Sequence, residues 1–215
     1  MDNLAEIFPF SVMARGGLLM WPILFCSLVA IAIVIERFIS LRRARIDTRE
    51  FMATIRTVLS AGRIDEAIRI CDDTEGPVAR ILKAGLLKHG RRKEEIREAI
   101  EDAAVLELPL LERYLGSLAT IVQISPLLGL LGTVYGMIKA FARIQQHAGL
   151  GPVSPSMLAE GIHNALYTTA AGLTVAIPAL ICYNYLVNMV NEMMVEMEIT
   201  SAELVDLLAE SSERE

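Results

Sequence analysis

Three long stretches without an Asp, Glu, Lys or Arg dominate this sequence, at residues 16–35, 114–138 and 161–191. A helix needs roughly 20 apolar residues to cross the ~30 Å hydrocarbon core of a bilayer, and each stretch is long enough. Lipid favours a helix because a helix satisfies its backbone polar groups within the segment. The alternative, three helices buried in a soluble core, is disfavoured because the 215 residues, 53% of them hydrophobic, leave too little polar chain to cover them.

The sequence therefore predicts an all-α membrane protein with three transmembrane helices and long helical cytoplasmic extensions. Five arginines follow the first stretch closely and set the orientation through the positive-inside rule: Arg37, Arg42, Arg43, Arg45 and Arg49. They place the N-terminus in the periplasm and the C-terminus in the cytoplasm. The expected segments are a periplasmic N-terminus (1–15), a first span (16–36), a cytoplasmic segment (37–113), a second span (114–140), a periplasmic loop (141–160), a third span (161–188) and a cytoplasmic tail (189–215).

The cytoplasmic segment shows four helical patterns. Asp47 followed by Glu50 indicates the start of a helix that ends near Gly62. Two more helices are expected at 63–72 and 78–89. A fourth begins near Lys93 and is expected to run, kinked at Pro109, into the second span as one long helix.

The tail is expected to continue the helix of the third span, with Glu192, Glu196, Glu203 and Glu210 near one stripe. Two interpretations stay open. The stripe is a solvated acidic face, or, in an oligomer, it lines an acidic vestibule that concentrates cations. Pairing with Arg42, Arg43 and Arg45 is a further option.

Small residues line one face of the second and third spans. In SPLLGLLGTVYGM (residues 125–137) they are Gly129, Gly132, Thr133 and Gly136, and in the third span they are Ala165, Thr168, Thr169, Gly172 and Ala176. Small residues let helix backbones approach closely in a membrane. Packing alone accounts for the glycines, whereas the hydroxyls of Thr133 and Thr169 suit either packing or contact with a partner.

The three stretches 16–35, 114–138 and 161–191 contain no Asp, Glu, Lys or Arg, so ion conduction would need a carboxylate from a partner helix. The widely spaced cysteines, Cys26, Cys71 and Cys182, predict neither a metal site nor a disulfide framework. No Gly-rich phosphate loop or basic nucleic-acid face is evident. The sequence thus predicts a protein that is not an enzyme and that uses no cofactor.

The motif SPLLGLLGTVYGM resembles the second span of the ExbB/TolQ proteins, and TTAAGLTVAIPALICYNYL (168–186) resembles their third span. The resemblance includes the internal Pro178 and the closing Tyr183 and Asn184. It covers the whole chain and places it in the MotA/TolQ/ExbB proton-channel family, most like the ExbB-like biopolymer transport proteins. MotA, with four spans and a longer chain, fits less well.

The resemblance implies a homopentamer in the bacterial inner membrane, surrounded by lipid, around two copies of a single-span partner like ExbD or TolR. The membrane aspartate of that partner would lie near Thr133, Thr169 and Asn164. Proton-motive ion flow would drive rotation and act on a periplasmic protein of the TonB or TolA kind. Packing and hinge roles fall on Pro126, Gly129, Gly132, Gly136, Gly172 and Pro178.

The chain departs from the family at one position. Where the family often has Glu in GI-x-E-A-L, this sequence reads GIHNAL, with Asn164. Asn cannot take up a charge, so proton relay there is in doubt, and the neighbouring His163 is an alternative titrating group. Proton versus Na⁺ stays open, as does the energised process, which includes gliding and Tol-type motors. A non-conducting membrane scaffold and a lone small transporter are the rival functions.

Overall fold

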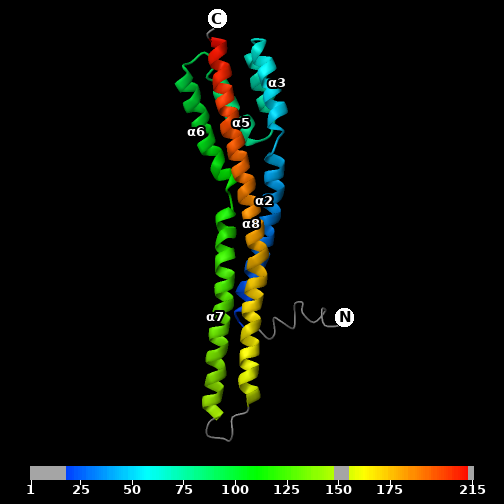
Figure 1. The fold of residues 1–215 in the computed structure, drawn as a ribbon, viewed down its shortest axis with the longest axis vertical. Coiled ribbons are helices and arrows are strands. Elements are labelled where there is room, and N and C mark those ends of the chain that lie inside the picture. Colours follow the sequence, from blue (N-terminus) through cyan, green and yellow to red (C-terminus); the bar gives the residue numbers. More distant parts are fainter. Residues whose placement is uncertain (1–17, 148–154, 213–215) are drawn as a thin grey trace, which may run out of the picture. The chain divides into compact units, whose positions relative to one another are not determined.

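The computed structural model describes residues 18–147 and 155–212, and the regular secondary structure in these ranges is α-helical (Figure 1). This confirms the all-α fold class. The expected N-terminal segment 1–15 and the Gly/Pro-rich residues 148–154 lie outside the described residues. The helices are α2 (Met20–Ala44), α3 (Thr48–Ser60), α4 (Ile64–Asp73), α5 (Pro77–Leu86), α6 (Lys93–Leu111), α7 (Leu115–His147) and α8 (Pro155–Ser212).

Three helical stretches are long and apolar enough to cross a membrane, within Met20–Ser60, Lys93–Gln146 and Gly161–Ala209. They include α2 and most of α7 and α8, so the structure agrees with the prediction of three helices long and apolar enough to span a membrane. Large apolar side chains on these helices face outward, as Phe25 (68% exposed) and Leu127 (61% exposed) illustrate. Such an apolar surface suits lipid rather than water.

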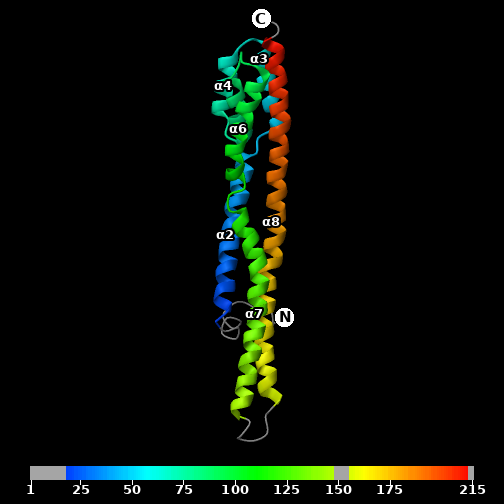
Figure 2. The same cartoon turned by 90° about the vertical axis from the view of Figure 1, so that its left-hand side faces the viewer.

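The chain forms two compact units. The membrane unit combines α2 as far as Ile35, α7, and α8 as far as Asn184. In both views α7 and this part of α8 run side by side (Figures 1 and 2). Its interior contains large apolar residues such as Ile23 and Leu118 together with many small ones: Ala30, Ala140, Ala165, Ala176 and Ala179 are buried. Small interior residues let the three helices pack closely.

The helical unit comprises residues 36–114 and α8 from Tyr185 on. Consecutive helices pack on one another, α3 on α4, α4 on α5 and α5 on α6. Its core contains fully buried Ile55, Ile81, Leu82 and Ile96, together with Leu204 and Leu208 from the end of α8. The tail is thus part of a hydrophobic core and not only a solvated helix.

Local signals explain where these helices begin. The Asp47 carboxylate accepts hydrogen bonds from the backbone N–H groups of Arg49 (3.1 Å) and Glu50 (3.2 Å), which caps α3 as expected. Gly76 precedes α5 with φ 139°, and a Cβ there would lie 2.9 Å from the carbonyl oxygen of Ala44. Only glycine tolerates both that φ and that approach.

The expected continuous helix from Lys93 into the second span is wrong. The α6 helix ends at Leu111 and α7 begins at Leu115, with Tyr114 between them at φ 64°. A left-handed residue ends a helix, and this conformation is uncommon for a bulky side chain. Arginine guanidinium groups lie over the Tyr114 ring, Arg113 at 4.6 Å and Arg37 at 5.6 Å from the centroid, and these contacts hold the ring in place.

The other expected helices are confirmed within a few residues. The patterns at 63–72 and 78–89 correspond to α4 and α5. The α8 helix runs unbroken to Ser212, so the tail does continue the third span. At the other end of the spans, α7 continues to His147 and α8 begins at Pro155, so much of the stretch 141–160 that was assigned to a loop is helical.

Buried charge adds to the core of the helical unit. Arg80 donates two hydrogen bonds to the Glu107 carboxylate, at 2.5 and 2.6 Å, and Glu107 is buried. This carboxylate raises the pKa of Arg80 further above its usual value. Arg37 is only 4% exposed, and it donates to both oxygens of Glu36 at 2.5 Å and to the carbonyl oxygen of Leu110 at 3.1 Å.

Candidate functional site

The membrane unit contains a close seam between α7 and α8, which we call the glycine–threonine seam. On the α7 side it consists of Ser125, Gly129, Gly132, Gly136 and Ala140, and on the α8 side of Gly161, Ala165, Thr168, Thr169 and Gly172. These residues are close neighbours across the two helices, and many of them belong to the small-residue faces that the sequence predicts. The structure therefore brings the two predicted faces together.

Gly132 and Gly136 make the closest approach on the α7 side. A Cβ added to Gly132 would lie 2.5 Å from the Cβ of Thr168, and one added to Gly136 would lie 2.8 Å from the Cβ of Ala165. Both distances are well inside van der Waals contact. Glycine is therefore required at these positions to let α8 approach α7.

The same is true in reverse for the glycines of α8. A Cβ on Gly161 would lie 2.5 Å from the Cβ of Ala140, and one on Gly172 would collide with the carbonyl oxygen of Ser125. Close backbone contact thus extends from Ser125 to Ala140 along α7. A seam of this kind replaces the hydrophobic effect, which is absent between helices in lipid.

One hydroxyl joins the two helices directly. The Thr169 hydroxyl donates to the carbonyl oxygen of Gly129 at 2.9 Å. Thr168 is buried and donates to the carbonyl of Ala165 within its own helix at 2.6 Å. Thr133, which is half-buried, donates to the carbonyl of Leu130 at 2.7 Å.

These hydrogen bonds determine how the hydroxyls can interact with a carboxyl group or a cation that comes close to them. A hydroxyl has one O–H donor and two acceptor lone pairs. In Thr133 and Thr169 the donor is used on a backbone carbonyl, so only acceptor capacity is left. Such oxygens can accept a hydrogen bond from a protonated carboxyl group or contribute to a cation site, and they offer no donor to a carboxylate.

The remaining predicted site residues lie in different surroundings. Pro126 and Pro178 lie inside α7 and α8, which continue through them. Asn164 falls within α8, but its side chain lies outside the described residues. The exposed His163 ring contacts the Tyr167 ring edge-on, with centroids 4.8 Å apart. Within the described residues, no group of three or more His, Cys, Asp or Glu side chains could hold a metal ion.

Thr168 is the residue that sequence reasoning undervalued. It was placed on the small face but given no role, yet it lies 1% exposed against Gly132 at the centre of the seam. The choice between Thr168 and Thr169 depends on the rotation of α8, which composition does not reveal. The spacing of Gly129, Gly132 and Gly136 could have indicated it, because the facing positions must also be small.

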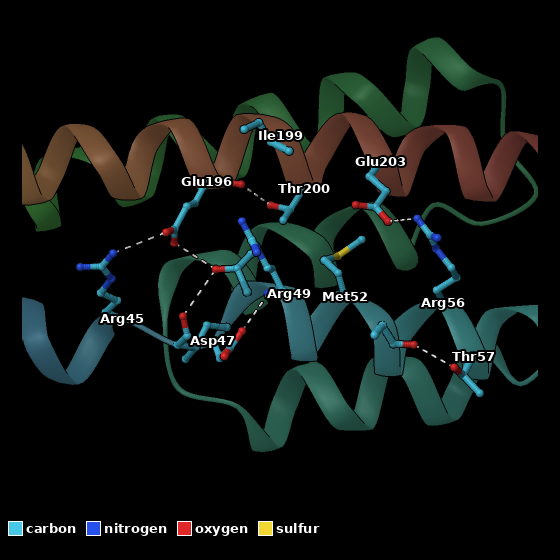
Figure 3. A pocket seen from close by; sticks show the side chains of 13 residues that line it. Arg45, Asp47, Arg49, Met52, Arg56, Thr57, Glu196, Ile199, Thr200 and Glu203 are labelled. Carbon is cyan, nitrogen blue, oxygen red and sulfur yellow. Dashed lines mark hydrogen bonds and ion pairs between the residues drawn. The ribbon is translucent and has the colours of Figure 1, made fainter.

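A second polar surface lies in the helical unit, in a groove of about 910 Å³ between α3 and the end of α8 (Figure 3). Arginines of one wall face glutamates of the other. Arg45 lies 3.4 Å from Glu192 and 3.9 Å from Glu196, and Arg56 pairs with Glu203. The Thr48 hydroxyl also donates to Glu196 at 3.0 Å.

These ion pairs bear on the two interpretations of the acidic stripe. Three of its four glutamates form ion pairs within the chain, and the side chain of Glu210 lies outside the described residues. The expected pairing is confirmed for Arg45. Among the described residues it is not found for Arg42 or Arg43, and the Arg42 guanidinium instead lies 4.3 Å from the centroid of the Phe38 ring. Less of the acidic charge is therefore left for a cation-concentrating vestibule.

Comparison with known proteins agrees with these features. Residues 73–199 match the MotA/TolQ/ExbB proton channel family. An ExbB homologue from Methanothermobacter thermautotrophicus is 30% identical over 88% of this chain and 65% of its own length. The biopolymer transport protein exbB1 of Vibrio cholerae is 35% identical over 76% of this chain and 72% of its own length. The Tol-Pal system protein TolQ of Haemophilus influenzae is 42% identical over 40% of this chain and 36% of its own length.

Proposed function

This chain belongs to the MotA/TolQ/ExbB proton channel family, a transport family and not an enzyme family, and we propose that it is a subunit of an ExbB/TolQ-type ion-driven motor. In this proposal five copies surround two copies of a single-span, ExbD/TolR-like partner. The partner supplies a membrane aspartate. The assembly lies in a bacterial inner membrane, with the N-terminus in the periplasm and the C-terminus in the cytoplasm.

The observation that carries the proposal is the chemistry of the glycine–threonine seam. Most of it lies on the charge-free stretches 114–138 and 161–191. The seam residue Thr169 and the adjacent Thr133 nevertheless present hydroxyl oxygens whose donors are already used. Thr133 and Thr169 would accept a hydrogen bond from the partner's acid in its protonated form. They would thereby favour that form at this position, and the acid would release its proton where the hydroxyls are absent.

The proposal also includes the process that the ion flow would drive. Ion flow would rotate the partner within the ring and act on a periplasmic protein of the TonB or TolA kind. The relatives named for biopolymer transport match far more of the chain than TolQ does, 88% against 40%, which favours an ExbB-like role. A Tol-type or gliding motor of the same family is the second candidate.

A non-conducting scaffold is the rival from another class. Its support is that Thr133, Thr168 and Thr169 all bond to backbone carbonyls within the chain, as packing alone would require. Thr133→Val and Thr169→Val separate the two functions, since each nearly preserves size and removes the hydroxyl. Thr→Ser at the same positions keeps the hydroxyl and serves as the matched control.

The test is purification of the tagged chain from its native membranes in mild detergent, followed by native mass spectrometry and by ion-gradient-driven activity in cells. We expect five copies with a single-span, aspartate-bearing companion, and activity that is lost in the Val variants but kept in the Ser variants. A monomer without such a companion, or full activity in both Val variants of an intact assembly, would favour the scaffold.

A further inference from the structure

The five arginines after the first span do not share one environment. Arg37 is buried and bonds to Glu36 and to the carbonyl of Leu110. Arg45 pairs with Glu192 and Glu196. Two of the remaining arginines, Arg42 and Arg43, are exposed in the last turn of α2, and no carboxylate among the described residues pairs with either of them.

Their position on α2 is equally distinctive. Ile31, Ile35 and Ile39 repeat every four residues and are 54%, 54% and 48% exposed, so they form an outward apolar stripe. Arg42 and Arg43 follow Ile39 by three and four residues, which places them on the same face one turn further along. The stripe that suits hydrocarbon therefore ends directly in two guanidinium groups.

An aromatic pair marks the same level as an interface. The Phe38 ring lies 6.2 Å from the ring of Tyr185 on α8, and Tyr185 is 51% exposed. Tyrosine is enriched where hydrocarbon gives way to headgroups. Exposed polar side chains lie on both sides of Tyr185 on α8, at Asn184 and Asn188. Both helices thus change from apolar to polar around Phe38 and Tyr185.

We propose that Arg42 and Arg43 bind the phosphate of an anionic phospholipid of the phosphatidylglycerol type. A guanidinium group donates two parallel hydrogen bonds to phosphate oxygens, and Arg42 is pre-oriented for this by its contact with Phe38 at 4.3 Å. The acyl chains of the same lipid would lie along Ile31, Ile35 and Ile39. A zwitterionic lipid binds less well because its ammonium group offsets the phosphate charge.

The site depends on the chain spanning a bilayer and not on the motor function. The chain is purified and placed in nanodiscs of phosphatidylcholine with a defined fraction of phosphatidylglycerol. Lipids retained after transfer to detergent are then counted by native mass spectrometry. The variant is Arg42→Gln with Arg43→Gln. The control is Lys88→Gln with Arg91→Gln, which removes the same charge from exposed residues of the turn before α6.

We expect the wild type and the control to retain phosphatidylglycerol over phosphatidylcholine, and the arginine variant to lose that preference by about tenfold or more. Arg42→Lys with Arg43→Lys, which keeps the charges that favour correct insertion, is expected to lose only part of it. The proposal is overturned if the Gln variant inserts normally and keeps its preference. It is equally overturned if the wild type shows none, or if glycerophosphate displaces the lipid at equal concentration, which would indicate a site for free anions.

Discussion

The Thr169 hydroxyl on α8 donates a 2.9 Å hydrogen bond to the carbonyl oxygen of Gly129 on α7. Gly129 lies so close to α8 that an added Cβ would be 2.9 Å from the Cα of Thr169. The missing side chain of Gly129 is what lets the hydroxyl reach this carbonyl. One pair of residues thus supplies both the close packing and a polar link between two apolar helices.

Gly132→Ala tests the packing of the seam. The new methyl group would lie 2.5 Å from the Cβ of Thr168, so either α8 shifts or the helices separate. We expect a loss of about 1–3 kcal/mol in unfolding free energy, measured by denaturant titration in detergent.

Gly116→Ala is the control for this change, because an added Cβ there meets nothing within 4 Å. Alanine favours a helix more than glycine, so Gly116→Ala should leave stability unchanged or raise it by up to about 1 kcal/mol. Equal effects at the two positions would argue against backbone contact at Gly132.

Thr169→Val tests the polar link between the helices. The change removes the bond to Gly129 but nearly keeps the volume, and we expect a loss of about 1 kcal/mol. Thr174→Val is the matched control, because Thr174 is exposed and donates only to Ala170 in its own helix. If Thr174→Val lowered the unfolding free energy as much in the same titration, the interhelical hydrogen bond of Thr169 would not contribute more than a bond within one helix.

Glu107→Gln tests the buried ion pair of the helical unit. The amide keeps one acceptor for Arg80 but loses the charge-assisted double bond, so we expect a loss of about 1–2 kcal/mol. Glu101→Gln breaks an exposed pair with Arg97 and should change stability by less than about 0.5 kcal/mol. The two variants are compared by thermal unfolding, and the reverse order of effects would contradict this assignment.

Cys71 gives a prediction that depends on pH. Burial, assisted by the Asp72 carboxylate, raises the pKa of the Cys71 thiol from 9.0 to about 12. The thiolate is the reactive form, so the folded protein should resist alkylation at pH 8–10 and react once it is unfolded. Between pH 9 and 12 the unfolded chain loses this proton while the folded chain keeps it, so stability falls as pH rises.

The measurement uses a Cys26→Ala, Cys182→Ala variant in which Cys71 is the remaining cysteine of the sequence. Alkylation is followed by mass spectrometry with and without denaturant. Rapid labelling of the folded variant at pH 8.5 would contradict the burial of Cys71 in α4.

The sequence predicts the spans well because a charge-free stretch has few other outcomes. It also predicts the start of α3, since a single side chain, Asp47, decides that cap. It does not predict the break at Tyr114, because tyrosine carries no signal for a left-handed conformation. The Tyr114 ring also contacts Arg37, which lies far away in the sequence, and no local pattern contains that contact.

The glycine–threonine seam could also be predicted only in part from the sequence. The small faces of α7 and α8 follow from residue spacing alone, whereas their contact depends on how far each helix is rotated. That rotation brings Thr168 against Gly132 and Thr169 against the carbonyl of Gly129. The link between Arg80 and Glu107 joins α5 to α6 across a turn, and it too lies beyond any periodic pattern.

The most direct measurement is ion flux into liposomes that contain this chain alone, the chain with its single-span partner, or the chain with a partner whose membrane aspartate is changed to Asn. A seam without an acid of its own should conduct only with the intact partner, so flux should be at background in the first and third samples. Substantial flux through the chain alone would contradict a borrowed acid, as would flux that survives the loss of the partner's carboxylate.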